Sequence, residues 1–181
     1  PRVEKGIVSS IRLYTYERVT PIISAKSFLW SPFLSKNFAT FSELFSHYQH
    51  LTFALSSDND KEAANAAKGM LKALPKINTE GFSAEQKSTF DDIAADIQEH
   101  SEHIGDNIGN IAHQREHLVV LSKDFYDIAK EFGTEKPMYK IFCSMYDDNK
   151  GAYWLSDSKE VKNPYYGEDM LTCGEVQEEL K

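Results

Sequence analysis

Residues 83–133, SAEQKSTFDDIAADIQEHSEHIGDNIGNIAHQREHLVVLSKDFYDIAKEFG, decide the fold. Ser83 opens a capping box, the pattern that satisfies free backbone N–H groups at the start of a helix. Apolar residues then recur at three- and four-residue steps, which predicts an amphipathic helix. A tight turn bracketed by Gly105 and Gly109 separates it from a second such pattern, which Gly133 ends. The stretch therefore predicts an antiparallel pair of helices.

Two further helical patterns precede this pair. The first begins at Asn37 and carries aromatic residues and leucines at helical spacing. The second is capped by Asp58 or Asn59 and stops before Pro75. Four helices joined by short loops predict a mainly α fold, an up-down four-helix bundle, in a domain that we assign to residues 37–181.

A different kind of sequence follows Pro137. The stretch Met138–Cys143 is typical of a short strand, whereas Asp147–Gly151 and Asn163–Gly167 are typical of turns. An acidic tail ends the chain. Because this segment is too short to fold alone, we expect it to form a small strand- and turn-rich cap on the bundle.

The charge of the chain is unevenly distributed. Its 181 residues carry a net charge of −8, but residues 1–36 hold six Lys/Arg against two Asp/Glu, a balance of +4, and the remainder has −12. We interpret residues 1–36 as a basic arm or strand pair outside the main domain. The acidic domain argues against a nucleic-acid partner, and no apolar stretch approaches the roughly 20 residues of a transmembrane helix.

All six histidines form helix-spaced pairs: His47 with His50, His100 with His103, and His113 with His117. This spacing places both rings of a pair on one helix face, as in metal sites built on helices. The second and third pairs flank the predicted turn at similar distances. The hairpin would therefore gather up to four imidazoles at one end of the bundle. The alternative interpretation is a set of solvated surface residues.

Sulfur forms a second group of candidate ligands. Cys143 and Met145 are two residues apart, so an extended chain points them the same way, and Met170 and Cys173 share one face of a helical turn. Thiolate and thioether together suit Cu(I) and, less specifically, zinc. Spacing alone ranks a disulfide, or inert buried thiols, above a metal site.

Signs of an enzyme are few. The sequence contains no GxSxG, P-loop, GxGxxG or HExxH pattern. A nucleophilic cysteine assisted by a histidine is conceivable, but no local pattern supports it. We therefore expect a protein without enzymatic activity.

The C-terminal segment resembles domain-of-unknown-function family 3347. The resemblance is carried by Tyr139–Met145 (YKIFCSM), Gly151–Ser156 (GAYWLS), Lys162–Gly167 (KNPYYG) and Met170–Val176 (MLTCGEV). In the helical half, Glu102–Ile104 and Gln114–His117 are similar to the family as well. The resemblance covers about residues 40–178.

The resemblance implies a helical bundle with a small cap, in the periplasm or attached to the outer membrane, that handles copper. Members of the family occur alone or fused to periplasmic adaptors of copper and silver efflux pumps. Family positions that look like ligands fall on Cys143, Met145 and Cys173, with His103 and His117 as partners. Family members commonly have proline where this chain has Ser144, so the loop loses a fixed φ angle.

The leading hypothesis is a soluble envelope domain that binds copper as Cu(I), or zinc, and scavenges it or delivers it to an efflux adaptor or another envelope protein. The candidate ligands are Cys143, Met145, Cys173, His103, His117, Met170, His113 and His100. The alternative is a structural or protein-interaction module in which Cys143 and Cys173 form a disulfide.

Overall fold

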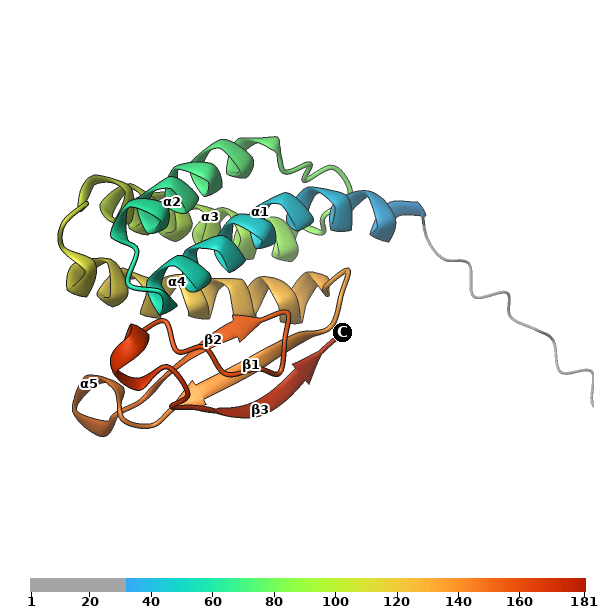
Figure 1. Cartoon of the computed structure of the whole chain (residues 1–181). Coiled ribbons are helices and arrows are strands. Elements are labelled where there is room, and N and C mark those ends of the chain that lie inside the picture. Colours follow the sequence, from blue (N-terminus) through green and yellow to red (C-terminus); the bar gives the residue numbers. More distant parts are fainter. Residues whose placement is uncertain (1–31) are drawn as a thin grey trace, which may run out of the picture. The chain divides into compact units, whose positions relative to one another are not determined.

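A computed structural model describes residues 32–181 of the chain, with side-chain detail from Phe41 onward. Long helices come first and a small antiparallel sheet follows, so the fold is mainly helical with a C-terminal sheet (Figure 1). Most of the segment predicted as a basic arm or strand pair, residues 1–36, lies outside the described residues. Residues 32–36 belong to the first helix.

The long helices are α1 (Pro32–Ser56), α2 (Asp60–Ala73), α3 (Ala84–Asp106) and α4 (Ile111–Phe132). Helix α1 begins at Pro32 and not at the predicted Asn37, because proline fits the first turn of a helix, where its missing N–H has no partner to lose. The predicted caps of α2 and α3 are confirmed. Asn59 accepts the N–H of Glu62, and Ser83 forms its capping box with the side chain three residues on.

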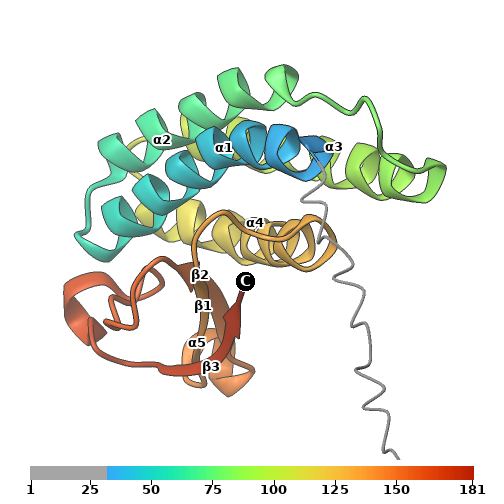
Figure 2. The same cartoon turned by 90° about the vertical axis from the view of Figure 1, so that its right-hand side faces the viewer.

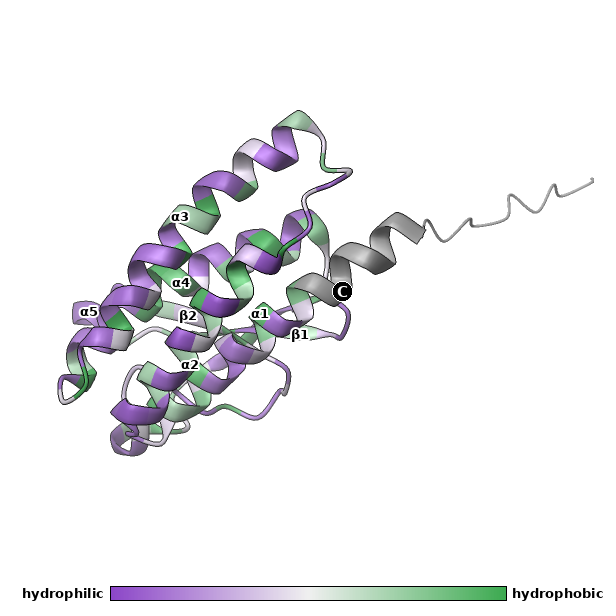
Figure 3. Ribbon diagram, turned by 90° about the horizontal axis from the view of Figure 1, so that it is seen from above, coloured by the Kyte–Doolittle hydropathy of each residue, from purple (hydrophilic) through white to green (hydrophobic). Residues whose placement is uncertain are grey.

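Consecutive helices pack along one another, and α4 also contacts the sheet (Figure 2). Coloured by hydropathy, the long helices show interleaved hydrophilic and hydrophobic residues, as amphipathic helices must (Figure 3). Their apolar residues form one core with those of the sheet. The largest fully buried side chains are Trp154, Tyr48, Phe125, Leu44, Leu51, Leu55, Met70, Ile97, Ile104, Leu118, Leu121 and Ile128.

The C-terminal sheet has the order β2-β1-β3, and both pairings are antiparallel. Its strands are β1 (Met138–Cys143), β2 (Ala152–Ser156) and β3 (Glu175–Leu180), and the short helices are α5 (Tyr146–Asn149), η1 (Leu74–Lys76) and η2 (Gly167–Met170). The predicted strand Met138–Cys143 is therefore confirmed. The acidic tail, in contrast, is a strand, in which Leu180 lies opposite Met138 and Glu178 bonds to Tyr126 and Lys130 of α4.

Tyr48 of α1 joins the helices to the sheet. Its buried hydroxyl bonds to Ser122 Oγ of α4 at 2.9 Å and accepts the N–H of Leu155 of β2 at 3.1 Å. Tyr165 is buried as well and donates to the carbonyl of Tyr153 at 2.6 Å. The helices and the sheet thus share a satisfied polar network within the core.

Arg115 of α4 makes a second connection. It donates to the carbonyls of Pro164 and Leu55, both at 2.8 Å, and pairs with Asp58 in the turn between α1 and α2. Arg115 thus fixes the turn-rich segment before β3 against two helices, close to the end of α4 that carries the histidines. Among the described residues, no helix is both long and apolar enough to cross a membrane.

Candidate metal centre

The turn between α3 and α4 is built to hold two helix ends together. Asn107 donates from its side chain to the carbonyl of His103 at 2.8 Å, and Asn110 accepts the N–H of His113. Gly109 has a φ of 90°, in the left-handed region that favours glycine, and its N–H donates to Asp60 of α2 at 2.6 Å. The last turns of α3 and the first turns of α4 are therefore held in register.

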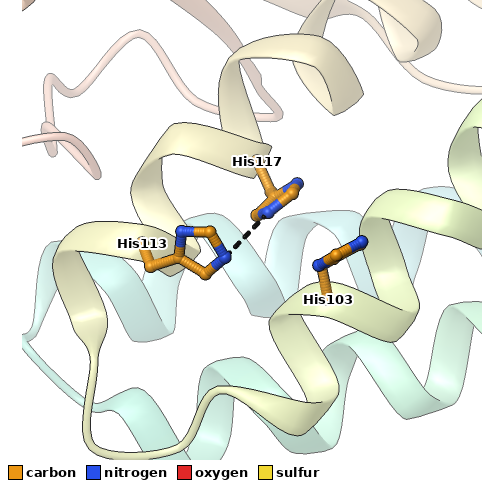
Figure 4. A group of neighbouring side chains, drawn as sticks. All are labelled: His103, His113 and His117. Atoms are coloured by element: carbon orange, nitrogen blue, oxygen red, sulfur yellow. Dashed lines mark hydrogen bonds between the residues drawn. The ribbon is translucent and has the colours of Figure 1, made fainter.

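This hairpin brings four imidazoles together. A ring nitrogen from each of His103, His113 and His117 lies within 4.8 Å of the others. Figure 4 shows the three rings converging from the two helices. His100, one turn before His103, approaches His117 from its other side, with 2.7 Å between their Nδ1 atoms. The predicted gathering of the two histidine pairs is confirmed.

His113 and His117 both direct Nε2 toward the middle of the histidine cluster. Their Nε2 atoms are 3.1 Å apart (Figure 4). The other nitrogen of His113 is 3.1 Å from the carboxylate of Glu116. His103 lies over the face of His117, with ring centroids 4.5 Å apart and planes at 15°.

The electrostatics keep the central ring neutral. Burial, followed by repulsion from the three neighbouring imidazoles, lowers the pKa of His117 to about 4. A neutral imidazole has a free lone pair, which is what metal coordination requires. His117 is therefore ready to bind an ion at neutral pH without first losing a charge.

The first histidine pair, His47 and His50, lies elsewhere. His50 is 3.2 Å from Glu62, and the ring of His47 packs so closely on Gly69 that a Cβ there would overlap it. Burial is the main cause that lowers the pKa of His47. This pair has structural contacts and no part in the cluster.

The structure also brings the two cysteines together. Cys143 ends β1 and is fully buried, Cys173 is partly exposed, and their Sγ atoms are 3.1 Å apart as free thiols. The hydrogen bond with Cys143, then burial, raises the pKa of the Cys173 thiol.

The two methionines have different surroundings. The chain turns after Cys143, so Met145 is 46% exposed while Cys143 is buried, and the prediction that both point the same way is wrong. Met170 and Cys173 do share a turn, through the N–H of Cys173 and the carbonyl of Met170 at 2.9 Å. Within residues 41–181, neither cysteine joins a group of three or more His, Cys, Asp or Glu ligands.

Sequence reasoning missed two charged groups. Glu116 lies three residues after His113, a spacing that favours contact between two side chains on one helix. Asp124 is 1% exposed, and its Oδ2 has no hydrogen-bond partner. Burial, with the carboxylates of Asp96 and Asp127, raises the pKa of Asp124 to about 7. No pattern in the sequence marks Asp124 as buried.

The fold and the cluster together define a mainly helical domain with a histidine-rich hairpin and a dithiol-bearing sheet. Residues 44–137, slightly more than half of the chain, match the family described as "Protein of unknown function (DUF3347)". The chain belongs to this family. Comparison with curated proteins and with solved structures gives no match.

Proposed function

We propose that this chain is a metal-binding domain without enzymatic activity, which holds one transition-metal ion through His103, His113 and His117. The observation that carries the proposal is the convergence of three ring nitrogens within 4.8 Å. In this proposal the four helices act as an up-down bundle, and the ion lies at the end where α3 meets α4.

The distances suit a metal ion. Two nitrogens bound to one tetrahedral ion at 2.0–2.1 Å lie about 3.3 Å apart. The Nε2 atoms of His113 and His117 are already 3.1 Å apart. His103 is the most exposed of the three rings, and rotation of its side chain closes the remaining separation. Three protein ligands leave a fourth position open, through which an ion exchanges with a partner.

Copper is the proposed ion and zinc the next best. Imidazole suits Zn, Cu, Ni and Fe, and within the divalent series Cu²⁺ binds a given nitrogen site most tightly. The resemblance to envelope proteins associated with copper efflux supports the same ion. We therefore propose that the domain scavenges copper in the periplasm or at the outer membrane and delivers it to an efflux adaptor or another envelope protein.

The thiol pair offers a second donor set. Cys143 and Cys173, with Met145 and Met170 nearby in sequence, match the preference of Cu(I) for soft ligands. Because neither cysteine lies with the histidines in a common group of ligands, the histidine centre does not depend on them.

The proposal is tested by calorimetric titration of Zn²⁺ into the protein with its thiols reduced, and of Cu²⁺ into the Cys143→Ser/Cys173→Ser variant, because Cu²⁺ oxidises free thiols. We expect one tight site in the wild type and in the Cys143→Ser/Cys173→Ser variant. The His113→Ala variant should bind at least about 10-fold more weakly, because one of three ligands is lost. His50→Ala removes a histidine outside the cluster and is the matched control. Wild-type affinity in His113→Ala would refute the histidine centre.

The second candidate is a structural or protein-interaction module stabilised by a Cys143–Cys173 disulfide. The 3.1 Å between the two sulfurs favours it, since little movement separates this contact from a bond. A thiol count on denatured, unreduced protein tests it. No free thiols, together with no metal bound by the wild type, would favour this module over a metal carrier.

A further inference from the structure

We infer that His100 is not a ligand of the proposed ion but the residue that positions His117 for it. The inference rests on the proposed metal centre. It assigns His100 the role of accepting a hydrogen bond from His117 Nδ1–H, which leaves His117 Nε2 as the atom that binds the ion.

The distance between His100 and His117 is that of a hydrogen bond. Nitrogens bound to the same tetrahedral ion are about 3.3 Å apart, close to the 3.1 Å between the Nε2 atoms of His113 and His117, whereas hydrogen-bonded atoms approach to about 2.7 Å. The Nδ1 atoms of His100 and His117 are 2.7 Å apart, which is a hydrogen-bond distance and too short for two ligands of one ion.

The orientation of the rings distinguishes His100 from His103. His100 and His117 are tilted by 48° with centroids 5.0 Å apart, so His100 meets the edge of the His117 ring. His103 instead covers its face. The edge that His100 meets is the Nδ1 side, opposite the Nε2 atom that faces His113.

The number of ring protons agrees with this role of His100. A neutral imidazole carries one proton, so an ion on Nε2 of His117 places that proton on Nδ1. His100 Nδ1 must then accept, and His100 carries its own proton on Nε2. An ion on Nε2 of His113 likewise places the proton of that ring on Nδ1, which faces the carboxylate of Glu116 at 3.1 Å. Each Nε2 ligand thus has its own outer partner, the arrangement that fixes the tautomer and orientation of metal-bound histidines.

The two outer partners differ in charge. Glu116 is a carboxylate and makes His113 the more basic ligand, whereas His100 is neutral and orients His117 without adding negative charge. Glu116 is also far more exposed than the His100–His117 contact, with a side chain 68% exposed. We therefore expect His100 to restrict the orientation of the His117 ring more strongly than Glu116 restricts that of His113.

The test uses Co²⁺ alone as the probe, because its visible spectrum reports tetrahedral coordination, and compares His100→Ala with His100→Asn. The amide oxygen of Asn takes the place of Nδ1 and accepts the same hydrogen bond. We expect His100→Ala to bind Co²⁺ about 10- to 100-fold more weakly, with the tetrahedral spectrum and one-to-one stoichiometry retained. His100→Asn should recover most of the affinity, and His50→Asn is the matched control.

Four results are decisive. Equal losses in His100→Ala and His100→Asn with a changed spectrum would make His100 a ligand and overturn the inference. Wild-type affinity in His100→Ala would overturn it as well. Absence of Co²⁺ binding by the wild-type protein would instead refute the proposed metal centre. In the Zn²⁺-bound wild type, nitrogen NMR should show the proton of His117 on Nδ1, and a proton on Nε2 would contradict the assignment.

Discussion

Replacing Asp124 by asparagine should stabilise the protein at alkaline pH and not at acid pH. Asp124 is buried, its Oδ2 has no partner, and its pKa is raised from 3.8 to about 7. The main cause is burial, and the carboxylates of Asp96 and Asp127 add to it. Asparagine has nearly the same shape but carries no charge at any pH.

The direction in which the free energy of unfolding changes with pH follows from proton linkage. The folded state holds the Asp124 proton more tightly than the unfolded chain, so folding is favoured where the carboxyl is protonated. The free energy of unfolding therefore falls by about 1.4 kcal/mol per pH unit as pH rises from about 4 to 7, and then levels off. The shift of about three units sets an upper limit of about 4 kcal/mol on this loss.

The asparagine variant should recover about 1–3 kcal/mol at pH 8, less than the limit because its buried amide also lacks partners. Urea unfolding of both proteins at pH 5, 6, 7 and 8, with a chelator present, measures the difference. Asp91→Asn is the control, since Asp91 is exposed on α3 and pairs with Lys87. A difference between Asp124→Asn and wild type that does not change with pH would refute the reasoning.

Two further changes test the links between the helices and the sheet. Arg115→Ala should lower the free energy of unfolding by about 2–4 kcal/mol, because it leaves two carbonyls and the partly exposed Asp58 without their donor. A loss below about 0.5 kcal/mol in urea unfolding would show that these contacts do not hold the cap. Tyr48→Phe should lose about 1–3 kcal/mol, since the N–H of Leu155 loses its acceptor inside the core. An unchanged unfolding midpoint would contradict that role.

The sequence was sufficient to predict features that depend only on residues close together in the chain. The capping box at Ser83 and the asparagine cap at Asn59 depend on neighbouring residues, and both are confirmed. The clustering of the four histidines could be predicted in the same way, because the short turn and the helical spacing fix where the four rings lie.

Contacts between segments far apart in the chain could not be predicted from the sequence. Residues 175–180, EVQEEL, lack the apolar alternation of a strand, and β3 exists because β1 supplies its hydrogen bonds and α4 supplies partners for Glu178. The sequence also does not show that Cys143 and Cys173 lie beside each other but in no common group of ligands with the histidines among the described residues. Spacing along the chain says which residues share a face, but not which faces meet.

The most direct test of the central claim is X-ray absorption spectroscopy of the protein loaded with one equivalent of Zn²⁺ or Cu²⁺. The histidine centre should give a first shell of nitrogen and oxygen atoms at about 2.0–2.1 Å, with the outer-ring scattering of three imidazoles. Sulfur at about 2.3 Å would place the ion on Cys143 and Cys173 and contradict the assignment to His103, His113 and His117.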